Sequence, residues 1–148
     1  MPDYTTRKIL ALPPTLVMKC LLNPRNVLVT DLVRNVREMG SSTYEVVFIM
    51  KRFGGTRDIR FILNVVEKEK GRRLVYLFEG AEKTVIRIEW IITPINVGGG
   101  TMITASSKLK SKGMFSIKGK EVKKLIDGVL IRGIPLCSKL TMRYMEVI

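Results

Sequence analysis

The chain has 148 residues, 46% of them hydrophobic and 26% charged, and 26 Lys and Arg against 13 Asp and Glu give a net charge of +13. This balance is typical of a folded domain and excludes a disordered chain, and no apolar run reaches the ~18–20 residues that a membrane span needs. We expect one domain over residues 1–148, and a cytoplasmic location because the first eight residues lack a signal-like apolar segment. The absence of His and Gln, together with abundant Lys, Arg and Glu, favours a heat-adapted source.

The N-terminal part of the chain predicts one strand followed by two short helices. The strand is expected over residues 5–11, where β-prone side chains precede a Pro-Pro step. A proline suits the first turn of a helix, and an Asn-Pro step separates this helix from the next one. We expect the helices over residues 14–22 and 25–31, with the sheet resuming over residues 31–39.

The middle of the chain alternates apolar and polar residues with period two, which predicts antiparallel strands joined by hairpins. Further strands are expected over residues 43–51, 57–67, 72–79, 83–93 and 101–110. The alternation is sharpest over residues 83–93, where Ile86, Ile88 and Trp90 fall on one face and Arg87 and Glu89 on the other. We assign the apolar set to the buried face of the sheet.

The C-terminal segment, residues 119–144, repeats apolar residues at the spacing of one helical face. That face is predicted to hold Val122, Leu125, Ile126, Val129, Leu136, Cys137 and Leu140. Gly133 and Pro135 disfavour a helix interior, so we expect a kink over residues 131–135. The order of a strand, two short helices, six strands and a long helix is of the α+β class, with the helix lying on a curved antiparallel sheet.

Several segments carry a resemblance to a known family. They are ALPPTLVMKCLLNP, VREMGSSTYEVVF, KTVIRIEWIIT and GTMITASSKL, followed by the terminal helix. In this order they resemble the START-like superfamily, also called birch-pollen-allergen-like or SRPBCC, and small uncharacterised members of it from thermophilic archaea. The resemblance implies a helix-grip fold, in which a sheet of about seven strands wraps around the C-terminal helix. It also implies a cavity between them for an apolar or amphipathic ligand, without an invariant catalytic motif.

Strand register and the helix face together predict which residues line that cavity. They are Phe48, Phe61, Leu63, Tyr76, Phe78, Ile88, Trp90, Leu125, Ile126 and Val129. Apolar walls with a few polar groups are what small-molecule sites require, and Tyr76 and Trp90 could each donate a hydrogen bond to a ligand. The alternative is that these side chains meet and form a dry, packed core. We expect a non-enzymatic module that binds or carries a hydrophobic or amphipathic small molecule, with no cofactor.

A second hypothesis is based on the densest run of positive charge. The run consists of Lys108, Lys110, Lys112, Lys118, Lys120, Lys123 and Lys124. If the last strand and the start of the helix converge, these lysines would attract nucleic acid or another anionic partner. The run contains one aromatic residue, Phe115, and no arginine, whereas single-strand readers add aromatic stacking, so a solvated lysine surface is the alternative.

The residues available for catalysis and metal binding are few. Without His there is no Ser-His or Cys-His pair, and no metal site is predicted. A cyclase- or hydrolase-like enzyme, the third hypothesis, would need a carboxylate such as Asp58 or Glu89, which the alternation places on exposed faces. Cys20 and Cys137 lack a metal-binding spacing, so we expect buried thiols, with a disulfide as the alternative if their helices touch.

Overall fold

The computed structural model describes residues 1–52, 54–96, 98–111 and 117–147. Within them seven strands form one antiparallel sheet in the order β1-β7-β6-β5-β4-β3-β2. The strands are β1 (Tyr4–Leu10), β2 (Val33–Gly40), β3 (Thr43–Arg52), β4 (Gly55–Glu69), β5 (Arg73–Gly80), β6 (Val85–Pro94) and β7 (Thr101–Lys110). The helical segments are α1 (Pro14–Leu21), α2 (Pro24–Val27), α3 (Gly119–Gly128), the π-helix η1 (Val129–Gly133) and α4 (Ile134–Val147). The predicted α+β helix-grip fold is confirmed.

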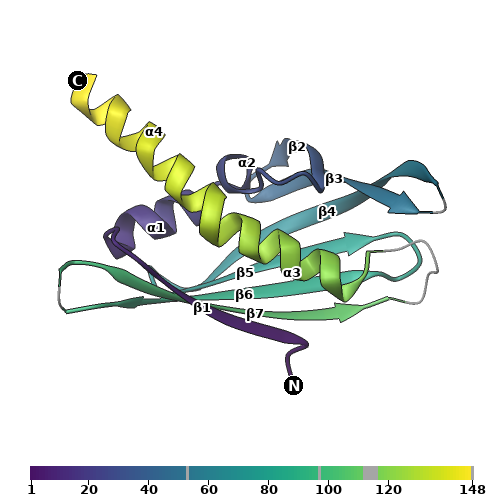
Figure 1. Ribbon diagram of the computed structural model, residues 1–148, viewed down its shortest axis with the longest axis horizontal. Coiled ribbons are helices and arrows are strands. Elements are labelled where there is room, and N and C mark those ends of the chain that lie inside the picture. Colours follow the sequence, from purple (N-terminus) through teal and green to yellow (C-terminus); the bar gives the residue numbers. More distant parts are fainter. Residues whose placement is uncertain (53, 97, 112–116, 148) are drawn as a thin grey trace.

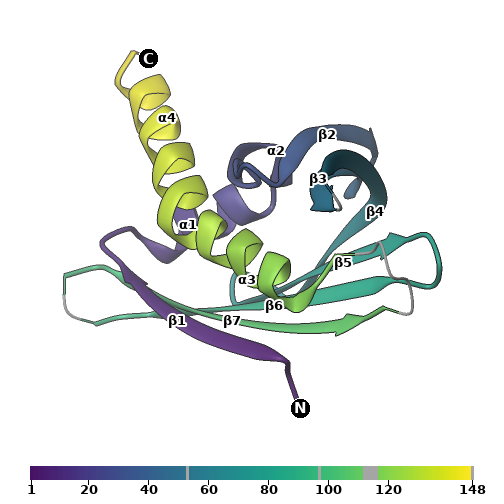
Figure 2. The same cartoon turned by 45° about the vertical axis from the view of Figure 1, so that its right-hand side comes forward.

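The sheet is curved, and all the helices lie on its concave face (Figures 1 and 2). The register agrees with the predicted alternation, since Tyr76 pairs with Ile88 and Trp90 pairs with Ala105, all of them buried. The alternate residues, such as Arg87, lie on the convex face. The concave face therefore supplies one side of the core and the helices supply the other.

The C-terminal helix buries two adjacent residues in every four. The buried pairs are Glu121 and Val122, Leu125 and Ile126, Val129 and Leu130, Gly133 and Ile134, and Cys137 and Ser138. A straight α-helix has 3.6 residues per turn, so a stripe with a repeat of four would rotate away from the sheet within a few turns. The wider π-helical turn of η1 corrects part of this rotation and keeps the stripe directed at the core.

The prediction that Leu136 and Leu140 share the buried face is wrong, because their side chains are 45% and 56% exposed. The predicted spacing assumed an uninterrupted α-helix, whereas η1 changes the helical phase, so that Ser138 is buried beside Cys137, which the spacing placed correctly. The helix also changes direction at η1, close to the expected kink (Figure 2). Beyond that point α4 continues past the sheet toward the C-terminus (Figure 1).

No helix in the described ranges is both long and apolar enough to cross a bilayer.

The β5–β6 hairpin contains a turn whose residues can be replaced to make the protein more stable. Glu82 and Lys83 have φ angles of 57° and 55°, and the Thr84 N–H donates to the Ala81 carbonyl over 3.1 Å, as in a type I′ turn. Because such angles favour Asn and Gly, the variant Glu82→Asn/Lys83→Gly is expected to raise the free energy of unfolding by about 1 kcal/mol. Urea denaturation measures the change.

The matched control exchanges the two residues, Glu82→Lys/Lys83→Glu, which retains both β-carbons and the net charge. It should leave the free energy of unfolding unchanged. If the exchanged variant is stabilised as much as Glu82→Asn/Lys83→Gly, the effect comes from side-chain charge and the conformational explanation is wrong.

Candidate functional site

The structure brings the ten predicted cavity residues together in one hydrophobic cluster. Seven come from the concave faces of β3 to β6, and three from α3 and the start of η1. Each exposes at most 1% of its surface, so in this conformation the side chains pack against one another and their neighbours. The cluster joins the sheet to the helix at the place where the resemblance implied a ligand.

Five aromatic rings form a continuous row across β3, β4, β5 and β6. Phe48 lies edge-on to Phe61 with ring centroids 5.2 Å apart, and Phe61 lies edge-on to Phe78 at 6.4 Å. Tyr76 continues the row, with centroids 6.3 Å from Phe78 and 5.5 Å from Trp90. Edge-to-face pairs contribute about 0.5–1.5 kcal/mol each beyond burial, so the row stiffens this side of the core.

The hydroxyl of Tyr76 is already occupied. It donates a hydrogen bond to the backbone carbonyl of Leu21 in α1, which ties the sheet to the first helix. Burial raises the pKa of the Tyr76 phenol well above its ordinary value, so the group stays neutral and keeps its proton for this bond. The expectation that Tyr76 could donate to a ligand is therefore wrong for this conformation.

Trp90 differs from Tyr76, because its Nε1–H is buried and has no hydrogen-bond partner within the described part of the chain. An indole N–H is a donor only, and a buried unpaired donor costs about 1–3 kcal/mol. The hydroxyl of Thr84 is the other buried side-chain group in this state. Trp90 is thus the polar point in the aromatic row that an acceptor atom could satisfy.

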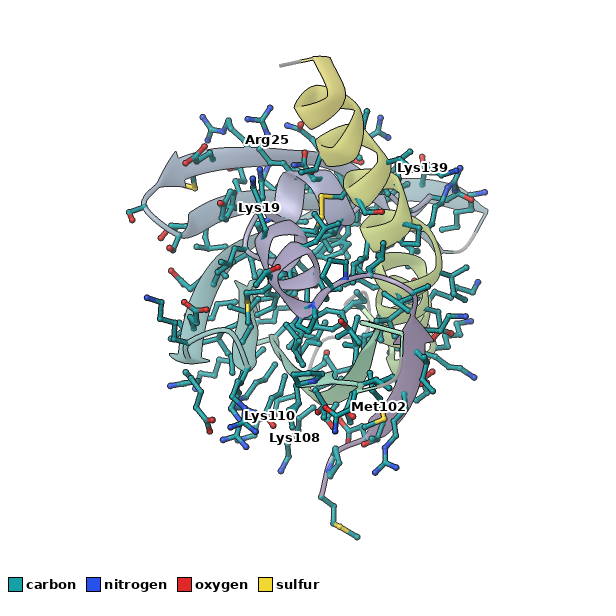
Figure 3. All side chains as sticks on the ribbon, turned by 90° about the vertical axis from the view of Figure 1, so that its left-hand side faces the viewer. Lys19, Arg25, Met102, Lys108, Lys110 and Lys139 are labelled. Atoms are coloured by element: carbon teal, nitrogen blue, oxygen red, sulfur yellow. A yellow bond between two sulfur atoms is a disulfide. The ribbon has the colours of Figure 1, made fainter. Side chains whose placement is uncertain are left out.

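Cys20 of α1 and Cys137 of α4 form a disulfide that spans 117 positions of the sequence, with Cα atoms 6.0 Å apart (Figure 3). The expectation of buried free thiols is wrong and the alternative of a disulfide is correct. The spacing placed Cys137 on the inner face of its helix, but the packing of α4 against α1 that brings the two sulfurs together is a non-local contact that spacing does not indicate. The bond fastens the C-terminal half of the long helix to the N-terminal helices.

The other half of the helix is attached to the sheet edge by polar contacts. The Tyr4 hydroxyl of β1 donates to Asp127 Oδ1 over 2.9 Å, and Lys123 Nζ lies 5.6 Å from the centroid of the Tyr4 ring. At the helix start, the Lys118 N–H donates to Glu121 Oε1 over 2.8 Å. These contacts are non-covalent and partly exposed, whereas α4 is held to α1 by a covalent bond.

The predicted lysine surface is not formed by the lysines that the structure describes. Lys108 and Lys110 alternate onto the convex face of β7, where Lys108 pairs with Arg87, and Figure 3 shows both on the opposite side of the molecule from Lys139 of α4. The group at the start of α3 lies on the concave side of the sheet and comprises Lys118, Lys120, Lys123 and Lys124. Lys112 lies outside the described residues. Strand alternation separates the run into two groups.

The two carboxylates considered for catalysis form ion pairs away from the core. Asp58 Oδ1 lies 3.0 Å from Arg34 Nε with half of its side chain exposed, and Glu89 Oε2 lies 3.4 Å from Arg87 Nη2. In the ranges that the structure covers, no three Cys, Asp or Glu side chains are grouped so that they could hold a metal ion. Neither carboxylate is in a position to act on a group inside the core.

Comparison with known proteins bears on the fold. No family model and no curated protein matches the chain. Among solved structures, a START superfamily protein from Mycobacterium smegmatis aligns with a TM-score of 0.60 and 14% identity over 98% of both chains. Ara h 8.0201 aligns with a TM-score of 0.61 and 13% identity over 95% of this chain and 97% of its own.

The di-domain ARO/CYC protein StfQ of the steffimycin biosynthetic pathway also aligns, with a TM-score of 0.58 and 14% identity over 89% of this chain and 44% of its own. Identities this low establish the fold alone. Together with the sheet order and the long C-terminal helix, they confirm the predicted resemblance: the chain has the START-like, birch-pollen-allergen-like helix-grip fold.

Proposed function

We propose that this protein binds a hydrophobic or amphipathic small molecule between the concave face of the sheet and α3, through the ten core residues that strand register and the helix face predict. The protein carries or sequesters this molecule and does not catalyse a reaction on it. The helix-grip fold that the chain shares with a START superfamily protein and an ARO/CYC protein supports the proposal. The observation that carries it is the buried, unpaired Nε1–H of Trp90 within the aromatic row.

Ligand entry requires the core to open, because the ten side chains are closed against one another. The two halves of the long helix suit this requirement. The disulfide fastens α4 to α1 covalently, whereas the described contacts of α3 with the sheet are non-covalent and consist of the Tyr4–Asp127 hydrogen bond, Lys123 over the Tyr4 ring, and its apolar face. π-helical turns such as η1 occur frequently at functional sites, and η1 lies between the two halves, so we infer that α3 moves away from the sheet while α4 stays in place.

Trp90 is the only tryptophan of the chain, so its fluorescence reports on this site alone. Titration with 1-dodecanol is expected to change the Trp90 emission saturably, because the hydroxyl oxygen can accept the indole N–H. Affinity is measured independently by displacement of the neutral dye N-phenyl-1-naphthylamine. In that assay, Trp90→Phe is expected to weaken 1-dodecanol binding about fivefold, the value of one hydrogen bond, and to leave dodecane binding unchanged.

The matched control is Thr84→Val, which removes the other buried unpaired polar group and should leave both affinities unchanged. If neither compound displaces the dye and the dye itself does not bind, the proposed function is wrong. If Trp90→Phe weakens the alkane as much as the alcohol, Trp90 contributes through packing and is not the polar contact.

A further inference from the structure

A hollow lies outside the core, along one flank of the long helix. It is a groove of about 590 Å³. The helix α3 and η1 form one wall, residues 30–32 form the second, and Ile49 and Lys51 of β3 form the third. Small-molecule sites usually measure about 300–1,000 Å³, so the groove is large enough for an organic ligand. We call it the basic groove, defined by Lys51, Lys120, Lys124, Arg132, Asp31 and Glu121.

The groove owes its shape to residues that recur every four positions along one flank of the helix. Lys120, Lys124, Gly128 and Arg132 follow one another at this spacing and all line the groove. Gly128 lets residues 30–32 approach the helix, since a β-carbon there would lie 2.1 Å from Thr30 Cγ2. The missing side chain at position 128 thus sets the width of the groove at its midpoint.

The charges in the groove are unbalanced. Four cationic and two anionic side chains line it, which leaves two positive charges in excess. Lys120, Lys124 and Arg132 form no ion pair with residues that the structure describes. Of the two acids, Glu121 is buried and accepts the Lys118 N–H, while Asp31 is exposed to solvent.

The position of the lysines is unfavourable for the helix itself. Like charges four residues apart repel each other by a few tenths of a kcal/mol, and the first turns of a helix favour anions. Lys120 and Lys124 are four residues apart in α3, and Lys120 also lies in its first turn. A local arrangement that costs stability without a compensating contact is characteristic of a ligand site, because a bound anion removes the repulsion.

We propose that the basic groove binds a phosphorylated small molecule, with its phosphate at Lys120 and Lys124 and its organic part along the groove toward Arg132. A phosphate monoester carries about −1.5 to −2 charges at pH 7, which matches the excess of two positive charges. The volume exceeds that of a phosphate ion, and Leu32 and Ile49 supply apolar contacts for an organic group. This site is separate from the core, and its existence does not depend on the proposed function.

The test compares 1-naphthyl phosphate, 1-naphthol and inorganic phosphate by isothermal titration calorimetry at low salt. We expect 1-naphthyl phosphate to bind at least tenfold more tightly than 1-naphthol, and its affinity to fall as NaCl is added. Inorganic phosphate should compete with it, but more weakly because it lacks the organic group. Equal affinity for the phosphate ester and the naphthol, or no binding of the ester, overturns the proposal.

Variants locate the site. Lys120→Met/Lys124→Met is expected to weaken 1-naphthyl phosphate at least tenfold, because it removes both charges at the phosphate. The matched control is Lys123→Met, on the same helix but beside the Tyr4 ring and outside the lining of the basic groove, which should change affinity less than twofold. If both variants lose the same affinity for 1-naphthyl phosphate, the effect is one of overall charge, and the proposal that the ester binds in the basic groove is wrong. The dye displacement assay tests the core with a neutral dye, and the calorimetric titration tests the basic groove with an anionic ester. Each proposal can therefore fail while the other holds.

Discussion

The double variant Cys20→Ser/Cys137→Ser is expected to lose about 4–5 kcal/mol of the free energy of unfolding. The disulfide closes a loop that spans 117 positions, and the chain-entropy cost of closing a loop of this length in the unfolded state is of that size. Domains are typically stable by about 5–15 kcal/mol, so the loss is a large share of the total. Both sulfurs are also buried, which means that the serine hydroxyls must find partners or remain unsatisfied.

Urea denaturation with and without dithiothreitol measures this loss. Reduction should shift the midpoint of the wild-type protein toward that of the double variant, and it should leave the variant where it is. The single variant Ser138→Ala, next to Cys137, serves as a control for altered packing in α4. A wild-type midpoint that does not respond to reductant would contradict a stabilising bond between α1 and α4.

The sheet could be predicted from the sequence because its signal is local. The alternation of Ile86, Ile88 and Trp90 with Arg87 and Glu89 in β6 depends only on the pleat of one strand, and the burial pattern follows it. The same argument applies to the other inward-facing strand residues, and the ten residues predicted to line a cavity, seven from strands and three from the helix, meet in one buried cluster. Register therefore predicts which side chains meet, but not whether they open for a ligand.

The buried face of the C-terminal helix was harder to predict, because the phase of this helix depends on a contact with a segment distant in the sequence. Apolar spacing alone favoured Leu136 and Leu140 as buried residues, and both are exposed. The π-helical turn before them accompanies the close approach of Gly133 to the backbone of Val27 in α2, which nothing in the local spacing indicates. The pairing of Cys20 with Cys137 depends on the same approach, which explains why the disulfide remained only an alternative.

The basic groove was missed for a related reason. Its lining comes from residues 30–32, β3 and α3, which are far apart in the sequence. Lys120 and Lys124 were read as members of a long lysine run, although Lys108 and Lys110 point to the opposite face of the sheet. The signal that could have separated them is the four-residue spacing of Lys120, Lys124, Gly128 and Arg132, which has the same repeat as the buried pairs but lies on the neighbouring flank of the helix.

The close contact at Gly133 predicts the second large effect. A β-carbon at this position would lie 2.1 Å from the Val27 carbonyl oxygen and 2.9 Å from the Val27 Cα. Both are backbone atoms, so no side chain can turn aside and either η1 or α2 must move. Overpacking of this kind costs about 1–3 kcal/mol or more, and the helix preference of Ala over Gly recovers at most about 1 kcal/mol. We therefore expect Gly133→Ala to lose about 2 kcal/mol in urea denaturation.

The matched control is Gly119→Ala, at the start of α3, where no described heavy atom beyond the adjoining residues and the helix backbone lies within 4 Å of the added carbon. That variant should be as stable as the wild-type protein or slightly more stable, because only helix preference changes. Displacement of η1 in Gly133→Ala also moves Cys137 away from Cys20, so the fraction of protein with free thiols should rise in Gly133→Ala and stay constant in the control. If the two variants are equally stable and equally oxidised, α2 and the C-terminal helix do not pack backbone to backbone, and the explanation of the altered helical phase by this contact is wrong.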